Sequence, residues 1–396
     1  MSAQNPLISG GPEMSVQSSP NIAVVGGGIV GASIAWHLSH EANVTIVAED
    51  IGGTATPNSF AWLNAAAGNP KFYYDFRHRS MERWREIAAE LPDLPIHWGG
   101  SLNWNMSPDE LEAYLDEHSA WGYDIVRVNR TEIQQREPAL QDSVMPEWGL
   151  YVAEEGAVEA HVAARQLIAD AKARGATLLS DKVTGFLKQE DGRISGVVTA
   201  GGVEARADHV VLAAGVGSVP LLAAENVTLP VTGVAGLLVN SKPTQAGLLN
   251  GIVNAEQLHL RQTLDGRIRS GSEFSGGDPG DDPQKTAEKL FGRVQGAVEG
   301  GDELEFDYYT VGYRPTPEDG LPILGSTGLD GLTVAVMHSG VTNAAIVGQL
   351  LSQQILTGVS DPALSNFELG RFAQNPYNSF STLIGYHNAI YRVFKL

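Results

Sequence analysis

The sequence predicts an α/β fold in which a discontinuous, Rossmann-like domain is interrupted by an inserted α+β domain. Three observations lead to this prediction. A strand, a glycine turn and a helix follow one another in residues 22–40, buried strands recur in residues 209–215 and 332–337, and a hairpin lies between those two strands. The length of 396 residues allows two or three domains with a cleft between them.

Composition and charge exclude several classes of protein. The chain has 46 acidic and 26 basic side chains, a formal charge of −20, which excludes nucleic acid as a partner and argues against an anionic membrane surface. It has no cysteine and therefore no disulfide, thiolate metal site or thiol-tethered cofactor, and we predict no metal site. Residues 210–224, the least polar stretch, are too short and too interrupted by glycine and proline for a membrane span. Residues 1–20 lack a signal-peptide pattern, so we expect a disordered leader and a cytoplasmic protein.

The first predicted element is a βαβ unit. Residues 22–25 form a buried strand, and residues 26–31 have the G-x-G-x-x-G spacing. A helix follows over residues 32–40, and a second strand over residues 44–49 ends at Glu49. Such glycines allow a tight turn, a close approach to a pyrophosphate and close helix packing, while the acid accepts hydrogen bonds from a ribose. A purely structural turn is the alternative, but the flanking strand, helix and acid favour a dinucleotide site. Its predicted residues are Gly26, Gly28, Ile29, Val30, Gly31, Glu49 and Asp50.

The middle of the chain adds two helices and several short strands. Residues 72–91 read as a helix whose many arginines are expected on a solvated face, and residues 160–174 as a helix that ends before Gly175. Short strands are predicted at residues 96–104, 177–179, 182–187, 196–199 and 209–215.

The second half begins with a hairpin. Residues 257–264 and 267–272 flank Asp265-Gly266, a two-residue turn signal. Strand alternation in residues 303–314 places Tyr308 and Arg314 on one face. A helix at 283–298, a strand at 332–337, a turn at 338–340 and a helix at 341–356 complete the pattern. The elements divide the chain into a leader (1–20), a first domain (21–70, 150–230 and 315–396) and an inserted domain (71–149 and 231–314).

With these elements in order, the chain resembles the FAD-dependent amino acid oxidase (DAO) family, which includes D-amino acid, glycine and sarcosine oxidases. The resemblance extends from Asn21 to about Phe372. It is carried by residues 24–31, by 312–315 together with 319–325, and by 337–342. It implies an FAD-binding domain of the glutathione-reductase type and an inserted substrate-binding domain on an antiparallel or mixed sheet. Because the chain has no cysteine, non-covalent FAD is expected.

The resemblance also implies further FAD contacts. One segment lies along the flavin, one backbone position contacts adenine, one turn lies beside the pyrophosphate, and the last helix caps the pyrimidine end of the flavin. A helix start directs N–H groups and positive dipole at the N1–C2=O edge, which becomes anionic on reduction. The segment along the flavin contains Thr54, Ala55, Ser59, Trp62 and Asn64, and the adenine contact is Val183. The turn beside the pyrophosphate contains Ala214 and Gly215, and the last helix begins with Gly340, Val341 and Thr342.

The main candidate for binding the substrate is Arg314, which matches the family arginine that pairs with the substrate carboxylate. A planar guanidinium suits that task because it makes two charge-assisted hydrogen bonds; the alternative is a structural ion pair with Glu318 or Asp319. His338 either contacts flavin or substrate or only braces its turn. Second-rank candidates for substrate contacts are Tyr308, His259 and Arg261. Where sarcosine-oxidase-like members carry a lysine, this chain has Asn343-Ala344, which favours the glycine and D-amino acid oxidase branch.

The function predicted from these features is FAD-dependent oxidation of the C–N bond of a small amine-bearing carboxylate. Hydride transfer to flavin N5 gives an imine that water hydrolyses, so no strong protein base is required. Oxygen or another carrier takes the electrons, and substrate chirality, N-alkylation and a homo-oligomer stay open. One alternative is a 2-hydroxy acid oxidase or dehydrogenase with His259 or His338 as base. The other is a flavin-carrying subunit of a larger complex.

Overall fold

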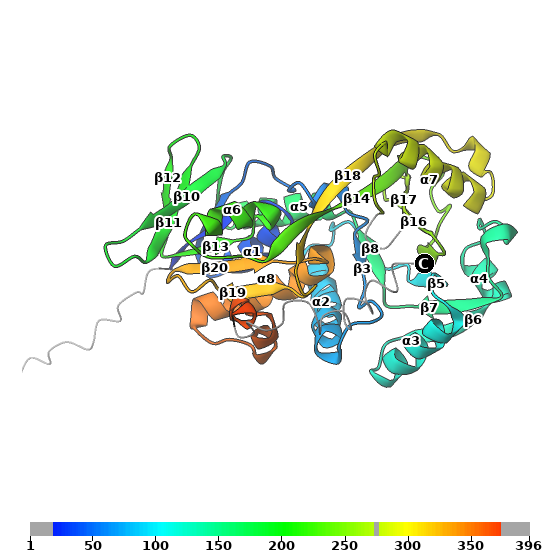
Figure 1. The fold of residues 1–396 in the computed structure, drawn as a ribbon, viewed down its shortest axis with the longest axis horizontal. Helices are drawn as coiled ribbons and strands as arrows, with labels where there is room; N and C mark the ends of the chain where they lie inside the picture. Colours follow the sequence, from blue (N-terminus) through cyan, green and yellow to red (C-terminus); the bar gives the residue numbers. More distant parts are fainter. Residues whose placement is uncertain (1–18, 273–276, 374–396) are drawn as a thin grey trace, which may run out of the picture.

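The computed structural model describes residues 19–272 and 277–373. Most of the expected leader, and residues 374–396 of the first predicted domain, lie outside the described residues. Two large sheets organise the chain and occupy opposite ends of its long axis (Figure 1).

The first sheet has six strands and is parallel except at one edge. Its strands are β1 (Asn21–Val25), β2 (Asn43–Val47), β9 (Thr177–Leu179), β13 (His209–Leu212), β19 (Ile323–Ser326) and β20 (Leu332–Val336). Their order is β19-β20-β13-β1-β2-β9, and β19 runs antiparallel to β20. Ile22 and Val24 belong to one hydrophobic cluster, whereas Ala23 and Val25 belong to another. The sheet is therefore covered on both faces, which explains why its strands read as continuous apolar runs.

Different elements cover the two faces of this sheet. On one face, α1 (Ile29–Leu38) packs against α5 (Ala160–Ala173) and α8 (Gly340–Thr357). On the other face lie the small sheet of β10 (Val183–Lys188), β11 (Ile194–Thr199) and β12 (Glu204–Arg206), and the short helix α6 (Ser218–Ala223). The result is the three-layer arrangement expected of a Rossmann-like domain.

The second sheet has eight strands in the order β18-β14-β17-β16-β15-β5-β7-β6 and is mostly antiparallel. One pair, β5 with β15, is parallel. The longest pair, β14 with β18, is in register from Val231 opposite Pro317 to Asn240 opposite Tyr308 and runs between the two halves of the molecule (Figure 1). The strands are β5 (Ser101–Asn103), β6 (Ile125–Asn129), β7 (Trp148–Val152), β14 (Val231–Ser241), β15 (Ile252–Ala255), β16 (Leu258–Gln262), β17 (Ile268–Gly271) and β18 (Phe306–Pro317).

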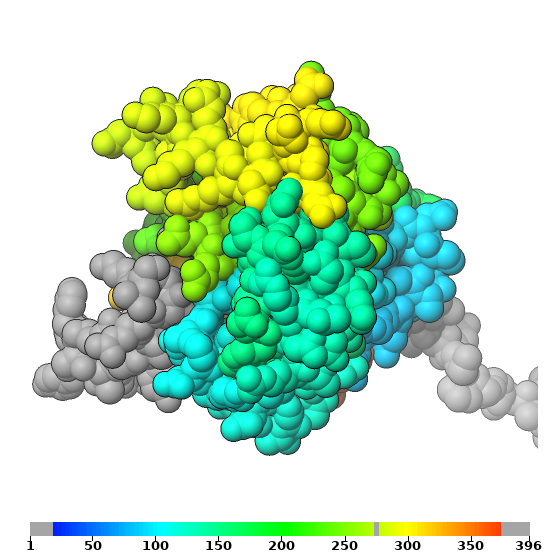
Figure 2. Space-filling view, turned by 90° about the vertical axis from the view of Figure 1, so that its right-hand side faces the viewer, coloured from blue at the N-terminus to red at the C-terminus, as the bar shows by residue number. Residues whose placement is uncertain are grey.

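Helices surround the second sheet and join it to the first. The outer end of the molecule is formed largely by the chain around α3 (Pro108–Ala120) and α4 (Arg130–Arg136), in teal, and around α7 (Pro283–Ala297), in yellow (Figure 2). Helix α2 (Lys71–Glu90) packs on α8. A small sheet of β3 (Trp62–Leu63), β8 (Gly156–Val158) and β4 (Ile96–His97) lies between the two halves. The 3₁₀ turns are η1 (Thr56–Asn58), η2 (Asp142–Val144), η3 (Gly215–Gly217), η4 (Gly301–Glu303), η5 (Pro362–Phe367) and η6 (Leu369–Phe372).

The predicted fold class is confirmed, with local differences. The predicted strand over residues 303–314 begins at Phe306 and continues to Pro317, because a 3₁₀ turn occupies residues 301–303. The hairpin loop has three residues rather than two: Thr263 N–H donates to the Arg267 carbonyl (2.8 Å), and Gly266 adopts a left-handed φ of 88°. Glycine there forms the bulge that a three-residue loop requires. The predicted domain boundaries stay a prediction.

Among the described residues, none of the helices combines the length and hydropathy needed to cross a membrane.

Candidate active site

A cavity of about 670 Å³ lies where the two halves of the molecule meet. Its wall comes mainly from the β1–α1 turn, the segment after β2, the turn after β13, strands β14 and β18, and the start of α8, and it is completed by the start of β10 and by Arg77 of α2. Most of the predicted site residues line it, namely Gly26, Gly28, Ile29, Val30, Glu49, Asp50, Thr54, Ala55, Ser59, Trp62, Val183, Ala214, Gly215, Arg314, His338, Gly340, Val341 and Thr342. Five predicted residues are not part of the lining: Gly31, Asn64, His259, Arg261 and Tyr308.

The glycines of the first turn differ in what surrounds them. A Cβ at Gly26 would lie 2.2 Å from the Ala213 carbonyl oxygen, and a Cβ at Gly31 would lie 2.1 Å from that of Gly26. These two glycines therefore close the turn against neighbouring backbone. At Gly28, by contrast, the first atom a Cβ would meet is Thr56 Oγ1 at 3.2 Å. A Cβ at Gly28 would therefore press on a side chain that itself lines the cavity, rather than on backbone.

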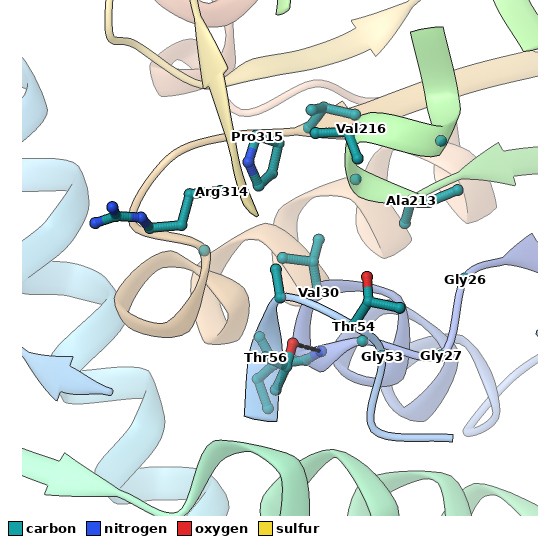
Figure 3. Close-up of a pocket in the computed structure, with 18 of the residues that line it drawn as sticks. Gly26, Gly27, Val30, Gly53, Thr54, Thr56, Ala213, Val216, Arg314 and Pro315 are labelled. Atoms are coloured by element: carbon teal, nitrogen blue, oxygen red, sulfur yellow. Dashed lines mark hydrogen bonds between the residues drawn. The ribbon is translucent and has the colours of Figure 1, made fainter. Parts of the chain in front are cut away.

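The start of α1 offers backbone donors to the cavity. Its first i to i−4 hydrogen bond runs from Ala32 N–H to the Gly28 carbonyl (2.8 Å), so the preceding amides have no partner within the helix. Thr56 Oγ1 accepts one of them, from Ile29 N–H at 3.1 Å, shown as a dashed line in Figure 3. The remaining donors and the positive end of the helix dipole suit a phosphate group. Thr56 was not predicted, because its contact spans 27 residues of chain.

A charged pair marks another part of the cavity. Glu49 ends the β2 segment as expected, and its carboxylate lies 4.0 Å from Lys182 Nζ, with both side chains largely exposed. Lys182 precedes Val183, the predicted adenine contact, and also lines the cavity. The carboxylate is accessible to a hydroxyl donor such as a ribose.

The start of α8 supplies a second set of helix donors. Ser339 precedes the helix in the left-handed conformation (φ 56°), and its side chain does not cap the helix. Its hydroxyl instead lies 2.9 Å from His338 Nδ1. Thr342 fixes the helix start to β3 by donating its hydroxyl to the Trp62 carbonyl (3.0 Å). The first-turn N–H groups of α8 consequently face the cavity without a capping side chain.

Arg314 lies in β18 and forms part of the cavity wall. Its Nη2 donates to the Ala235 carbonyl at 3.2 Å, and its side chain extends away from Gly26 and Gly27 (Figure 3). Asp319, one of the two alternative partners, forms a pair with Arg371 at 2.7 Å instead. The guanidinium thus places a positive charge on the part of the wall remote from the first glycine turn.

The two candidate histidines are neutral near pH 7. Burial, and then the charges of Arg314 and Arg77, lower the pKa of His338 to about 3. Burial and Arg314 lower the pKa of His259 to about 3 as well. His259 packs edge-on against Phe60, and its Nε2 is buried without a hydrogen-bond partner. Such low pKa values make both imidazoles weak bases.

The structure does not bring Arg261 and Tyr308 to the cavity wall. Arg261 is buried and donates to Glu159 (2.7 Å) and to the Phe60 carbonyl (2.8 Å). Tyr308 is 38% exposed, and Arg267 lies 5.4 Å from the centre of its ring.

One arginine of the helix over residues 71–90 departs from the solvated face expected for it. Arg77 is only 2% exposed and lines the cavity, so for this residue the expectation is wrong. The spacing of Tyr73, Arg77, Ser80 and Trp84 places Arg77 on the buried stripe of α2, as the burial pattern shows. That spacing is the signal that identifies it in the sequence.

Comparisons with known proteins agree with this arrangement. Residues 21–354 match the family described as FAD dependent oxidoreductase (DAO). The chain is 30% identical to a glycine oxidase of Pseudomonas putida, over 87% of this chain and 97% of that protein. It is 28% identical to the bifunctional protein ThiO/ThiG of Trichormus variabilis over 89% of this chain, but it spans only 55% of that protein. The crystal structure of glycine oxidase from Geobacillus kaustophilus superposes with a TM-score of 0.78, at 24% identity, over 90% of this chain and 99% of that one.

Proposed function

The chain belongs to the DAO family of FAD-dependent oxidoreductases, and we propose that it oxidises the C–N bond of a small amine-bearing carboxylate. The substrate is an amino acid or an N-alkyl amino acid. Its α-hydrogen leaves as hydride, and the resulting imine is hydrolysed by water to an oxo acid and ammonia, or to an oxo acid and an amine where the substrate is N-alkylated.

The cavity supports FAD as a non-covalent cofactor. Gly28 and Gly53 approach so closely that a Cβ on Gly53 would lie 2.7 Å from the Gly28 Cα, which gives the cavity a narrow wall of bare backbone. Beside it, the start of α1 would hold the pyrophosphate, and Glu49 would hold the ribose. The start of α8 would hold the N1–C2=O edge of the flavin. The chain contains no cysteine for a thioether link.

In this mechanism the protein positions the substrate and stabilises charge. When bound, FAD supplies the hydride acceptor. Arg314 binds the substrate carboxylate through two parallel hydrogen bonds and so fixes the direction of the α-hydrogen. Phe60 and Trp62 exclude water from the wall. His338 stays neutral, so it adds no charge that would repel a cationic amine.

The observation that carries the proposal is the convergence of Arg314 and the start of α8 on the cavity that the glycine turn also lines. An arginine, a helix terminus and a glycine-rich turn meet there, which are the groups that a carboxylate substrate and a dinucleotide require. The 2-hydroxy acid alternative is less well supported, because it requires a base. Its two candidates, His259 and His338, have pKa values lowered to about 3.

Turnover by the purified chain alone tests the proposal. Acid treatment is expected to release FAD, and the holoprotein is expected to oxidise an amine with oxygen or a dye as acceptor. The assay covers D- and L-amino acids, N-methylglycine and proline. Bound FAD without turnover of any amine by the chain alone would favour the alternative of a flavin-carrying subunit.

A further inference from the structure

Arg77 is a buried cation without an acidic partner. Its side chain comes from α2 and is 2% exposed. Within residues 19–272 and 277–373 it forms no ion pair, taken as a nitrogen–oxygen distance of at most 4.0 Å. A guanidinium removed from water without a counter-charge is costly, so a buried cation of this kind points to an anion that binds beside it.

The groups around Arg77 leave hydrogen-bond donors unused. Its Nε donates to the Asn64 backbone carbonyl at 3.0 Å, and its Nη2 donates to Asn64 Oδ1. Both acceptors of Asn64 are therefore occupied, and its buried Nδ2 has no hydrogen-bond partner. An orphaned donor next to a cation favours a ligand that accepts hydrogen bonds.

The same pair is attached to the start of α8. Asn64 N–H donates to Thr342 Oγ1 at 3.4 Å, and Ser80, one turn after Arg77 on α2, donates to the Thr342 carbonyl at 2.6 Å. Arg77 and Thr342 both line the cavity. A guanidinium and the positive end of an 18-residue helix thus lie together at one part of its wall, and Asn64, which carries the spare amide, lies directly behind them, hydrogen-bonded to both.

The buried acid that interacts with Arg77 electrostatically does not supply the missing charge in full. Glu155 accepts hydrogen bonds from Ser101 (2.5 Å), Tyr123 (2.6 Å) and Trp62 (2.8 Å). Burial raises its pKa to about 7, although these bonds and Arg77 act in the opposite direction. Near neutral pH it is therefore only partly ionised.

We propose that Arg77 and Asn64 form a second anion-binding locus in the cavity, separate from Arg314. It takes a planar, delocalised anionic group with two adjacent acceptor atoms. Two groups have this chemistry: the distal carboxylate of a dicarboxylic amine substrate and the N1–C2=O edge of the reduced flavin. This inference rests on the proposed function, since both groups belong to it.

Two titrations of the FAD-loaded protein, followed by flavin absorbance, distinguish these sources. The first compares succinate with butyrate and glutarate with valerate, which differ only in a distal carboxylate. The second uses sulfite, whose adduct with flavin places negative charge on the N1–C2=O edge. Each is carried out on the wild type, Arg77→Met and Arg77→Lys. The control is Arg79→Met, because Arg79 lies on the same helix but pairs with Asp361 and does not line the cavity.

If the locus holds a substrate carboxylate, wild type binds the dicarboxylates at least tenfold more tightly than their matched monocarboxylates. Arg77→Met then abolishes that preference and leaves sulfite affinity within twofold. If the locus holds the flavin edge, Arg77→Met weakens sulfite binding at least tenfold and leaves the carboxylate pairs unchanged. In either case Arg77→Lys keeps most of the wild-type affinity for the group that the locus binds, because lysine keeps the positive charge. Retained binding in Arg77→Lys also shows that the loss in Arg77→Met comes from the missing charge and not from misfolding.

Equal behaviour of Arg77→Met, Arg79→Met and wild type in both titrations overturns the inference. If these proteins still contain FAD and oxidise an amine, the proposed function stands. A wild type that binds no FAD would remove the proposed function and this inference together.

Discussion

At the scale of single residues, two buried glutamates four positions apart have opposite environments. Glu155 is surrounded by hydroxyl and indole donors, and burial raises its pKa to about 7. Glu159 is also desolvated, which opposes ionisation, but Arg261 and Arg269 outweigh this effect and lower its pKa. The difference comes from the nearest partner: neutral donors stabilise a carboxylate less than a guanidinium does.

Glu155 makes stability depend on pH in a defined direction. Because its folded-state pKa lies above the ordinary value of 4.5, the stability it contributes is full below that value and is lost as pH rises through 7. We expect Glu155→Gln to remove this dependence. The free energy of unfolding of wild type relative to the variant should fall by roughly 3 kcal/mol between about pH 5 and pH 8. Denaturant unfolding at both pH values measures it, and a constant difference would contradict the assignment.

Glu159→Gln is the matched control with the opposite sign. The lowered pKa of Glu159 means that its contribution is present above its ordinary pKa and is lost as the pH falls. The substitution breaks a buried pair with Arg261 and should cost about 3–5 kcal/mol near pH 7. The same unfolding measurements should show a smaller cost in acid.

Arg314 carries the expected contact with the substrate carboxylate. We predict that Arg314→Ala weakens binding of a carboxylate substrate by about 2–5 kcal/mol, because the carboxylate loses its charge-assisted hydrogen bonds to a half-buried guanidinium. FAD content should not change. Arg267→Ala is the control, since Arg267 pairs with Asp307 and does not line the cavity. Unchanged kcat/KM in Arg314→Ala would show that the substrate binds elsewhere.

At the scale of elements, the β1–α1 turn separates folding from cofactor binding. Gly28 has an ordinary φ of −71°, and a Cβ there meets no atom closer than 3.2 Å. We therefore expect Gly28→Ala to fold with little loss of stability but to bind FAD at least tenfold more weakly, because the methyl group presses on Thr56 and disturbs the turn that would hold the pyrophosphate. Fluorescence titration of the apoprotein with FAD measures the affinity, and thermal unfolding of the apoprotein measures the stability.

Gly31→Ala provides the contrast within the same turn. Its Cβ would lie 2.1 Å from the Gly26 carbonyl oxygen, so the apoprotein itself should be destabilised. If Gly28→Ala and Gly31→Ala lowered apoprotein stability equally, the distinction between the two glycines would be wrong.

Elements defined by local sequence were the most predictable. The βαβ unit and the helix after Ser339 follow from glycine spacing and hydrophobic pattern, which act over a few residues. Helical spacing places Arg77 on the buried stripe of α2, but the partners of Thr56 and Arg77 lie on segments packed together by the fold, so local pattern does not reveal these contacts. Arg261 lies in a predicted hairpin, yet its direction is set by Glu159, 102 residues away. Site membership therefore required the tertiary structure even where the element was predicted correctly.

At the scale of the whole molecule, the cavity joins the two halves. Trp62 lines it and donates to Glu155, which also accepts from Ser101 on the second sheet. Arg314, on the β14–β18 pair, lines the same cavity. A cofactor bound there contacts several separate segments of the chain and should stabilise all of them.

FAD is accordingly expected to raise the thermal stability of the apoprotein by mass action. At a thousandfold excess over its dissociation constant, a ligand that binds only the folded state adds about 4 kcal/mol. The unfolding temperature should rise with FAD concentration. Adenosine monophosphate, which lacks the flavin and half of the pyrophosphate, is the control and should give a much smaller rise. A rise of equal size with both would mean that the flavin contributes nothing to binding.

The central claim, oxidation of an amine rather than a hydroxy acid, is tested most directly by anaerobic titration of the FAD-loaded protein. The substrates are matched pairs that differ only in the reacting group: glycine with glycolate, and each enantiomer of alanine with the corresponding lactate. N-methylglycine and proline complete the series. The account predicts that at least one amine abolishes the visible flavin absorbance while its hydroxy partner does not. Reduction by the hydroxy acids with the amines inert would contradict it.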